Sequence, residues 1–242
     1  MTEKKCLIEI DNVGKTFADG TNALVSVSLK IFDGDFIVIA GSNGSGKSVL
    51  MSIIADIEPP TSGKIINNES RVGLVFQNAD SQILGETVLE DVLFGLRNLP
   101  LKKQERIQKA EETLKQCGLY EKRDFQAKFL SGGEKRRLAV AGILALNRDF
   151  IIFDEPFANL DYFGIKQVCS ILKKLKDEHK TIIVLTHDLE KILGLADSFI
   201  ILDSGEIKFN GTPEEGLKQN LEQFGIRNPI TTYNSVKDLF WI

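Results

Sequence analysis

The chain contains 242 residues, of which 30 are Lys or Arg and 34 are Asp or Glu, so its formal net charge is −4. Its length suits one or two domains with a substantial core, and a hydrophobic content of 43% with 26% charged residues excludes a disordered or collagen-like chain. The acidic balance argues against a general nucleic-acid-binding surface, which requires a basic face.

Neither a secretion signal nor a membrane span is expected. The first residues become polar too early for a signal-peptide core, and no window approaches the roughly 18 consecutive apolar residues of a spanning helix. Cys6, Cys117 and Cys169 are far apart and odd in number, so we expect free thiols in a reducing compartment. Any role in a membrane process would be exercised from the cytoplasmic side.

The first part of the chain predicts an antiparallel β region added to a sheet. Residues 7–12 and 27–32 alternate between apolar and polar side chains, and the turn residues Asp19 and Gly20 lie between them.

The rest of the chain alternates short apolar runs with longer helical patterns. The apolar runs are rich in Ile, Val and Phe and fit strands buried on both faces, as a parallel sheet requires. They lie at residues 36–40, 72–76, 150–154, 181–185 and 199–202. The helical patterns lie at residues 47–56, 102–117, 132–146 and 164–177. This alternation predicts an α/β fold with a mostly parallel sheet.

We expect a single domain with an insertion. The α/β core would occupy about residues 1–76 and 148–215, and a helical subdomain at about residues 77–147 would be inserted into it. A C-terminal helix and tail would follow over residues 212–242. Trp241, the sole tryptophan, is interpreted as a packing anchor or, alternatively, as a contact with a partner.

A phosphate-binding loop follows the apolar run at residues 36–40. Residues 41–48 fit the pattern G-x-x-x-x-G-K-S between a strand and a helix. Glycines let main-chain N–H groups approach a polyphosphate, and the next helix directs its N-terminus at the same anion. Lys47 would contact the β and γ phosphates, and the Ser48 hydroxyl would hold Mg²⁺. The expected nucleotide-binding residues here are Gly41, Ser42, Asn43, Gly44, Ser45, Gly46, Lys47, Ser48 and Val49.

Two carboxylates end the apolar run at residues 150–153. Both would emerge at the C-terminal edge of the sheet, where ligands of α/β proteins bind. Asp154 would hold Mg²⁺, usually through water, and Glu155 would orient or deprotonate an attacking water. The alternative is a strand that simply ends in a polar turn, which Pro156 fits equally well, but the phosphate loop upstream favours the catalytic interpretation.

An ordered set of motifs resembles the ATP-binding-cassette (ABC) ATPases over about residues 5–215. The sequence LSGGE at residues 130–134, followed by a basic and apolar helix, is similar to the signature motif of that family. The other matching motifs are the phosphate loop, Gln77 after its strand, Asp154 and Glu155, the segment at residues 158–161 and the triplet at residues 186–188. The resemblance implies a P-loop NTPase core with an N-terminal antiparallel β region and an inserted helical subdomain.

The signature is predicted to act on a second chain. A second helix N-terminus that could bind an anion begins at Ser131, Gly132 and Gly133. A single phosphate group does not need two such sites in one chain. The resemblance implies that two cassettes pack head to tail, each signature capping the γ phosphate held by the partner's phosphate loop. Asp161 matches the aspartate that communicates across this dimer.

The resemblance assigns three further roles. His187 matches the switch histidine, which touches the γ phosphate and helps to hold Glu155 and the water, although a lone histidine at a strand end is commonly structural. Gln77 would reach Mg²⁺ or the water. Phe17 occupies the place of the aromatic residue that stacks on adenine, with a core phenylalanine as the alternative.

Residues 78–95 look like the corresponding segment of energy-coupling-factor and cobalt, nickel or biotin importer ATPases. In those systems it forms a groove for coupling helices of a membrane subunit, which would place Glu86, Glu90 and Asp91 near arginines. The alternative is a helix N-terminus that favours acids anyway. Val49 departs from the family's usual threonine, so we expect a modest loss of ATP affinity relative to Val49→Thr.

These observations predict an ATP-binding, ATP-hydrolysing subunit that energises a membrane importer for a vitamin or transition metal. Its cofactors would be ATP and Mg²⁺. Its partners would be a second ABC ATPase chain, identical or related, a transmembrane coupling subunit and a substrate-binding membrane subunit, at the cytoplasmic face of the membrane and without nucleic acid. One alternative is a soluble ABC ATPase in translation or DNA repair, which usually carries two cassettes or a long coiled coil. Another is a clamp that binds ATP without turnover, which the presence of Glu155, His187 and Gln77 disfavours.

Overall fold

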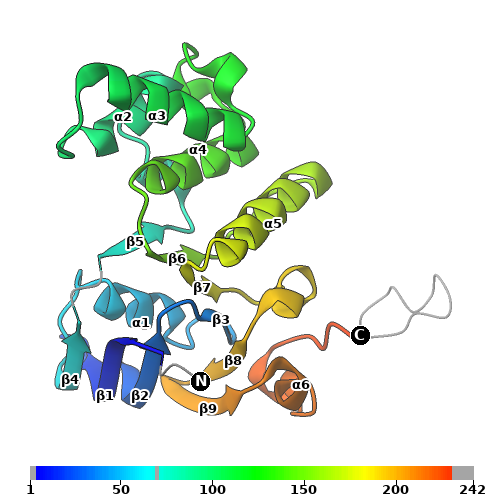
Figure 1. Cartoon of the computed structure of the whole chain (residues 1–242). Helices are drawn as coiled ribbons and strands as arrows, with labels where there is room; N and C mark the ends of the chain where they lie inside the picture. Colours follow the sequence, from blue (N-terminus) through cyan, green and yellow to red (C-terminus); the bar gives the residue numbers. More distant parts are fainter. Residues whose placement is uncertain (1–3, 69–70, 231–242) are drawn as a thin grey trace, which may run out of the picture.

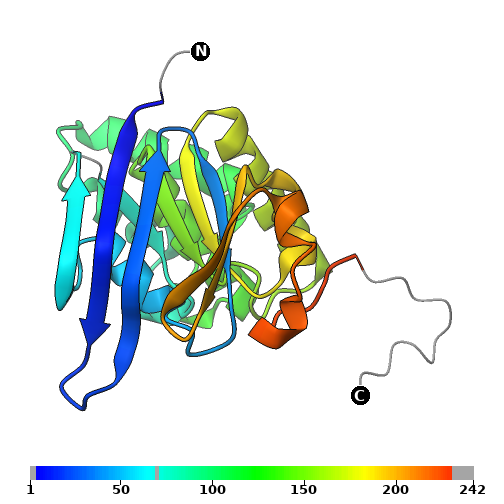
Figure 2. The same cartoon turned by 90° about the horizontal axis from the view of Figure 1, so that it is seen from below.

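The computed structural model describes residues 4–68 and 71–230. A parallel sheet lies at its centre, an antiparallel sheet packs below it, and a layer of helices lies above it (Figure 1). The antiparallel sheet has the order β2-β1-β4 and contains β1 (Cys6–Thr16), β2 (Asn22–Phe32) and β4 (Ser62–Asn67). Figure 2 shows this sheet from below, with its strands running side by side.

The central sheet has the order β5-β6-β7-β3-β8-β9. Only β9 pairs in the antiparallel sense. The strands are β3 (Phe36–Ala40), β5 (Val72–Val75), β6 (Phe150–Asp154), β7 (Thr181–Leu185), β8 (Ser198–Asp203) and β9 (Glu206–Gly211). Every residue of β3, β6 and β7 is buried, which explains their continuous apolar runs. The predicted α/β fold, mostly parallel sheet and N-terminal antiparallel region are therefore confirmed.

Alternate residues of the central strands enter two different cores. Ile37 and Ile39 of β3 pack towards α1 (Lys47–Ile54) and the antiparallel sheet, whereas Val38 packs on the opposite face. That opposite face is covered by α5 (Tyr162–Asp177), which buries Val168 and Leu172. Both faces of the sheet are thus covered by other elements, so a ligand could reach the sheet only at its edges.

The helical layer follows β5 in the chain. It consists of η1 (Ala79–Ser81), α2 (Val88–Leu96), α3 (Lys103–Gln116), η2 (Tyr120–Lys122), η3 (Ala127–Phe129) and α4 (Gly132–Ala145). Reciprocal capping boxes begin α2, between Thr87 and Glu90, and α4, between Ser131 and Glu134. The predicted helices at residues 47–56, 102–117, 132–146 and 164–177 are confirmed, with small shifts of their ends.

The C-terminal part differs from the expectation of one helix. After β9 the chain forms a short α-helix of four residues and then a 3-10 helix, and Leu221 of the latter is buried in the core. Before the C-terminal part, η4 (Leu189–Lys191) and η5 (Leu193–Leu195) follow β7; after β9 come α6 (Pro213–Gly216) and η6 (Leu221–Phe224). Trp241 lies outside the described residues. Within residues 4–68 and 71–230, no helix is long and apolar enough to cross a bilayer.

Candidate active site

The ends of three strands bring the predicted site residues to one edge of the central sheet. Leu185 at the end of β7 pairs with Ile39 of β3 on one side and with Asp154 of β6 on the other. The loop after β3 therefore lies beside the carboxylates that follow β6 and the triplet that follows β7. This is the carboxyl edge, where parallel α/β sheets place their ligands.

Residues 41–48 form a tight loop between β3 and α1. Gly44 and Gly46 have φ values of 82° and 103°, which residues other than glycine adopt only with strain. A Cβ on Gly41 would lie 2.0 Å from the carbonyl oxygen of Leu202, and one on Gly46 would lie 2.5 Å from that of Ala23. Each of these two glycines is needed because another stretch of backbone approaches it closely. In this loop Asn43 and Gly44 are exposed, Ser42, Gly46 and Val49 are half-buried, and Gly41, Ser45 and Lys47 are buried.

Lys47 lies inside this loop. Its Nζ donates to the carbonyl oxygens of Gly41 at 2.8 Å and Ser42 at 2.9 Å. Burial lowers the pKa of Lys47, and the nearby carboxylates of Glu155 and Asp154 oppose that shift. The loop thus holds a desolvated cation among main-chain groups, as binding of a polyphosphate requires.

Ser48 and Asp154 share a shallow pocket. The Ser48 hydroxyl donates to Asp154 Oδ2 at 3.0 Å, and Gln77 and Asn159 line the same pocket. Burial raises the pKa of Asp154, Glu155 raises it further, and the hydrogen bond from Ser48 lowers it.

The donor set of this pocket suits magnesium. A hydroxyl, a carboxylate and an amide offer the oxygen ligands that Mg²⁺ prefers, with phosphates and water completing its shell. Among residues 4–68 and 71–230, no group of three or more His, Cys, Asp or Glu side chains could hold a metal ion by itself.

Glu155 is held in an unusual backbone conformation by the strand end beside it. Its φ is 45°, in the left-handed region, and its N–H donates to the carbonyl oxygen of Leu185 at 2.9 Å. Thr186 Oγ1 donates to one carboxylate oxygen at 3.1 Å, and His187 Nδ1 lies 2.8 Å from the other. The carboxylate is buried, whereas the His187 side chain is 55% exposed. Glu155 and His187 are thus brought together, and Thr186 is an additional partner that sequence reasoning did not assign.

Arg136 is a second residue that sequence reasoning missed. It projects from α4 and is only 3% exposed, and its Nη1 donates to the carbonyl oxygens of Phe76 at 2.9 Å and Asp154 at 3.3 Å. One guanidinium therefore joins the signature helix to the residues immediately before Gln77 and Glu155. Burial lowers the pKa of Arg136, although Asp154 and Glu155 oppose that change. The only signal in the sequence is the pair of adjacent arginines, Arg136 and Arg137, in a helix whose other side is apolar.

The signature residues lie apart from the phosphate loop of the same chain. Ser131 accepts the N–H of Glu134 at 3.3 Å, and its own N–H donates to Glu134 at 2.9 Å. Ser131 and Gly132 are exposed, and no hydrogen bond joins residues 131–133 to residues 41–48, all of which the structure describes. This helix end therefore remains open to another molecule.

Asp161 and Phe17 occupy exposed positions. Asp161 caps α5 by accepting the N–H of Gly164 at 2.7 Å. Phe17 is 38% exposed, belongs to neither core cluster, and has Lys15 Nζ 5.7 Å from its ring centre. An exposed ring fits the expectation of base stacking better than that of a core phenylalanine.

Two of the three acids expected to face a membrane subunit have local roles. Glu90 completes the cap of α2, and Asp91 is 9% exposed and accepts the N–H groups of Leu84 at 2.7 Å and Gly85 at 2.9 Å. The Glu86 side chain is exposed and has no hydrogen bond or ion pair with any residue in the described ranges. Glu86 is therefore the acid that remains available at this surface.

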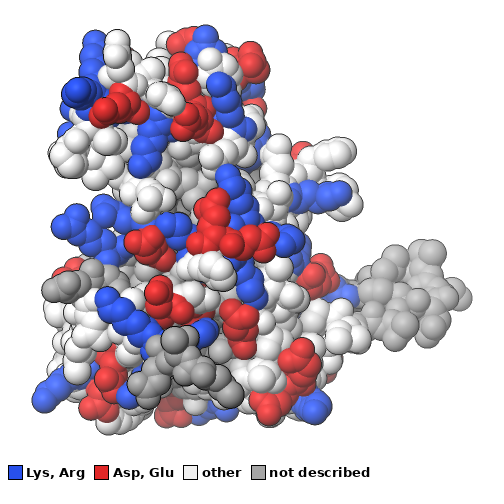
Figure 3. Space-filling model, in the orientation of Figure 1, with Lys and Arg blue, Asp and Glu red and all other residues white. Residues whose placement is uncertain are grey.

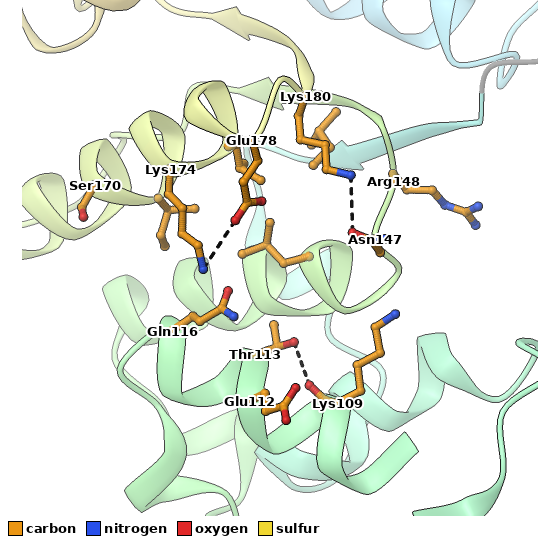
Figure 4. A pocket seen from close by; sticks show the side chains of 14 residues that line it. Lys109, Glu112, Thr113, Gln116, Asn147, Arg148, Ser170, Lys174, Glu178 and Lys180 are labelled. Carbon is orange, nitrogen blue, oxygen red and sulfur yellow. Dashed lines mark hydrogen bonds and ion pairs between the residues drawn. The ribbon is translucent and has the colours of Figure 1, made fainter. Parts of the chain in front are cut away.

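Neither the charge distribution nor the pocket between α3, α4 and α5 points to another ligand class. On the face shown in Figure 3, acidic and basic side chains are interspersed, so this face offers no continuous basic surface. The pocket in Figure 4 lies between α3, α4 and α5 and contains none of the predicted site residues. Its Lys174 pairs with Glu178, and its Lys180 contacts Asn147.

Comparisons with known proteins agree with the motifs. The family described as ABC transporter matches residues 24–158. The energy-coupling factor transporter ATP-binding protein EcfA of Carboxydothermus hydrogenoformans is 38% identical, covering 92% of this chain and 87% of that protein. EcfA1 of Caldanaerobacter subterraneus subsp. tengcongensis is 37% identical, covering 93% and 88%.

Solved structures show the same likeness. The chain resembles cbiO1 from Clostridium perfringens, which is part of the ABC transporter complex cbiONQ, with a TM-score of 0.79, 30% identity and coverage of 90% of this chain and 92% of that one. It also resembles a dimeric, post-hydrolysis state of the ATP-binding cassette MJ0796 bound to ADP and Pi, with a TM-score of 0.77, 30% identity and coverage of 86% and 99%.

Proposed function

This chain belongs to the ABC transporter family and is an ATPase that binds ATP, and we propose that it energises a membrane importer of the energy-coupling-factor type, taking up a vitamin or a transition metal. The relatives named EcfA and the likeness to cbiO1 support the importer class. The division into an α/β core at residues 1–76 and 148–215 and a helical subdomain at residues 77–147 is part of the same proposal.

The observation that carries the catalytic proposal is the environment of Glu155. Its buried carboxylate lies between Thr186 and His187 and follows Asp154, which contacts Ser48 of the phosphate loop. A carboxylate held in this way can orient a water molecule and accept its proton. His187 would hold the Glu155 carboxylate in place. It would also contact the γ phosphate while negative charge builds up on that phosphate during hydrolysis.

The phosphate loop would supply most of the binding. Main-chain N–H groups of residues 41–48 and the N-terminus of α1 would surround the phosphates, and Lys47 would exchange its contacts with loop carbonyls for the β and γ phosphates. Mg²⁺, when bound at Ser48, Gln77 and Asp154, would neutralise phosphate charge. Phe17 would stack on adenine, and the main-chain N–H of Val49 would replace the contact usually made by a threonine.

A second cassette would complete the site. In the described part of the chain, Ser131, Gly132 and Gly133 are exposed or half-buried and have no hydrogen bond with the phosphate loop of their own chain, which supports the proposal that they cap a γ phosphate held by a partner. Asp161 would contact that partner near the two sites. ATP would then join two chains, identical or related, and hydrolysis would let them open.

The relatives support the proposal that the chain has membrane partners. A transmembrane coupling subunit would dock on the helical layer near Glu86, a separate membrane subunit would choose the substrate, and the chain would act as a peripheral protein at the cytoplasmic face. The relatives named EcfA and EcfA1 are transporter proteins and so favour transport over a soluble role in translation or DNA repair. A clamp without turnover is disfavoured by the paired Glu155 and His187.

Glu155→Gln tests the proposed mechanism. We expect the variant to bind ATP as tightly as the unchanged chain, to lose roughly 100-fold or more in turnover because the base is absent, and to accumulate as an ATP-bound dimer. Turnover and sedimentation with ATP and Mg²⁺ measure both effects.

Glu214→Gln, the same chemical change at an exposed position, is the control and should behave like the unchanged chain. Normal hydrolysis by Glu155→Gln would assign the base to another residue. Binding of ATP by Lys47→Ala with undiminished affinity and turnover would remove the phosphate-loop assignment itself.

A further inference from the structure

Two large aromatic side chains are exposed at the start of α5. Tyr162 is 68% exposed and Phe163 is 76% exposed, and their rings meet edge to face with centres 5.8 Å apart. Lys166 Nζ lies 5.6 Å from the centre of the Tyr162 ring. Adjacent exposed aromatics form an apolar patch of the kind that marks a contact surface.

The patch does not contribute to the packing of its own helix. The apolar side of α5 is formed by Val168, Ile171, Leu172 and Leu175, which enter the core. In Figure 1, α5 stands out between the helical layer and the sheet. Because Asp161 caps the helix through the N–H of Gly164, the backbone that carries both rings is fixed.

The segment that leads into the patch runs between the two surfaces that ATP would join. Asn159 lines the pocket that holds Ser48 and Asp154. The next residue, Leu160, reaches the signature, since its Cδ2 would lie 3.3 Å from a Cβ on Gly133. Residues 159–163 thus lead from beside the phosphate loop, past the signature, to the surface.

Symmetry determines what such a segment meets in a head-to-tail dimer. If the phosphate loop of each chain contacts the signature of the other, the two contacts are related by a twofold axis that passes between them. Surface lying between a chain's own phosphate loop and its own signature is then close to that axis and faces the same surface of the partner. A patch there must be complementary to itself, and edge-to-face aromatic rings satisfy that requirement.

We propose that Tyr162 and Phe163 pack against the same two residues of a second copy of this chain when ATP closes the dimer. This inference rests on the nucleotide-driven dimerisation in the proposed function. A second copy is favoured over a membrane subunit because the patch adjoins Asn159 and Leu160, beside the nucleotide and signature surfaces, whereas the exposed acid Glu86 lies in the helical layer. The contact would stabilise the closed dimer without touching ATP.

The test measures dimerisation of the chain carrying Glu155→Gln. We expect Tyr162→Ser with Phe163→Ser to weaken the ATP-dependent dimer at least about tenfold, equal to about 1.4 kcal/mol, with ATP affinity of the monomer unchanged. The control is Phe125→Ser, which removes another exposed aromatic that lies under a lysine, with Lys122 Nζ 5.5 Å from its ring centre. Sedimentation velocity across a range of concentrations, with and without ATP and Mg²⁺, gives the dissociation constants.

A second measurement probes proximity directly. With Phe163→Cys, a short bismaleimide should join two chains much faster with ATP than without it, whereas Phe125→Cys should show no such increase. The thermal unfolding midpoint of each variant identifies a change that merely unfolds the chain, although the exposure of both rings predicts little loss of stability.

The outcomes separate this inference from the proposed function. A Glu155→Gln parent that binds ATP but stays monomeric contradicts nucleotide-driven pairing of two copies, and the aromatic contact falls with it. A parent that dimerises equally well with and without the two serines overturns the aromatic contact alone. A double serine variant that dimerises normally but no longer binds membrane subunits also overturns it, by assigning the patch to a different partner.

Discussion

At the scale of single residues, the site depends on two kinds of side chain. Some would face the nucleotide, and others hold the main chain of the site in place by hydrogen bonds. Asp154 ends a buried strand and Glu155 follows it, but their positions also depend on Arg136, whose guanidinium donates to the Asp154 carbonyl oxygen from a different layer of the molecule. A buried cation that donates to the Phe76 and Asp154 carbonyls replaces solvent for both. Arg136 is therefore a positioning residue rather than a catalytic one.

Replacing Arg136 with methionine should lower turnover more than ATP binding. The two carbonyl groups would lose a charged donor, which costs about 1.5–3 kcal/mol in the free energy of unfolding, and the residues next to Gln77 and Glu155 would become less ordered. We expect kcat at saturating ATP to fall roughly tenfold, since about 1.4 kcal/mol of transition-state stabilisation would be lost, while the Kd for ATP changes little.

The neighbouring Lys135 supplies the control for Arg136. Lys135 pairs with Asp80 at the surface and should contribute at most about 1 kcal/mol to stability, so Lys135→Met should leave kcat unchanged. Partial recovery of kcat in Arg136→Lys would support positioning by charge. Equal losses in both methionine variants would show that any change on this helix has the same effect.

At the scale of secondary structure, the predictable elements are those whose own residue pattern shows whether their faces are buried or exposed. The runs at residues 36–40, 150–154 and 181–185 are apolar throughout because both faces of their strands are covered. The loop at residues 41–48 was predictable for a related reason, since its glycines and lysine are dictated by local backbone geometry and by the phosphate it would bind.

Elements that depend on distant partners were not predictable. β9 is half-exposed and pairs only with the edge of β8, so its sequence has no buried pattern. The contacts of Arg136 with Phe76 and Asp154 span 60 and 18 residues of chain, and the hydrogen bond from Thr186 to Glu155 spans 31. Such contacts arise from the packing of layers, which local periodicity does not encode.

The short turn η6 shows how a C-terminal element can influence the phosphate loop. Leu221 and Ile226 are 2% and 1% exposed in the core, and between them Gly225 has a φ of 66°. A Cβ on Gly225 would lie 3.1 Å from the Cβ of Ser42. Nearby, Arg227 approaches Glu190, three residues after His187, at 3.6 Å. This segment therefore packs against two loops of the candidate site.

Gly225→Ala should weaken ATP binding severalfold as well as reduce stability. A left-handed alanine costs about 1–2 kcal/mol, and the new methyl group would press on Ser42 in the phosphate loop. Gly34→Ala is the matched control, because Gly34 has a φ of 76° and the nearest atom to its added Cβ, the carbonyl oxygen of His179, would lie 3.8 Å away. Titration calorimetry with ATP and thermal unfolding distinguish the two effects. Equal ATP affinities in both variants would show that η6 does not influence the phosphate loop.

At the scale of the whole molecule, the proposed function requires surfaces that contact other proteins. Among the residues that the structure describes, the signature residues 131–133 have no hydrogen bond with the phosphate loop of their own chain, and Glu86 is exposed just before α2. Under the proposed function, a second cassette would contact the signature and a membrane subunit would contact the helical layer. The proposed function therefore requires that both surfaces be occupied in the cell.

Capture of the membrane partners tests this arrangement. We expect the tagged chain, isolated from detergent-solubilised membranes of its native cells, to carry two kinds of membrane subunit that mass spectrometry identifies. Glu86→Arg should reduce their recovery by roughly tenfold or more, because a like charge would then face the arginines that we expect on the coupling subunit. Glu121→Arg, an equal change of charge at another exposed position of the helical layer, should leave recovery unchanged. Recovery of ribosomal or DNA-repair proteins alone would overturn the transport role, whereas normal recovery with Glu86→Arg would move the docking surface elsewhere on the helical layer and leave the ATPase assignment intact.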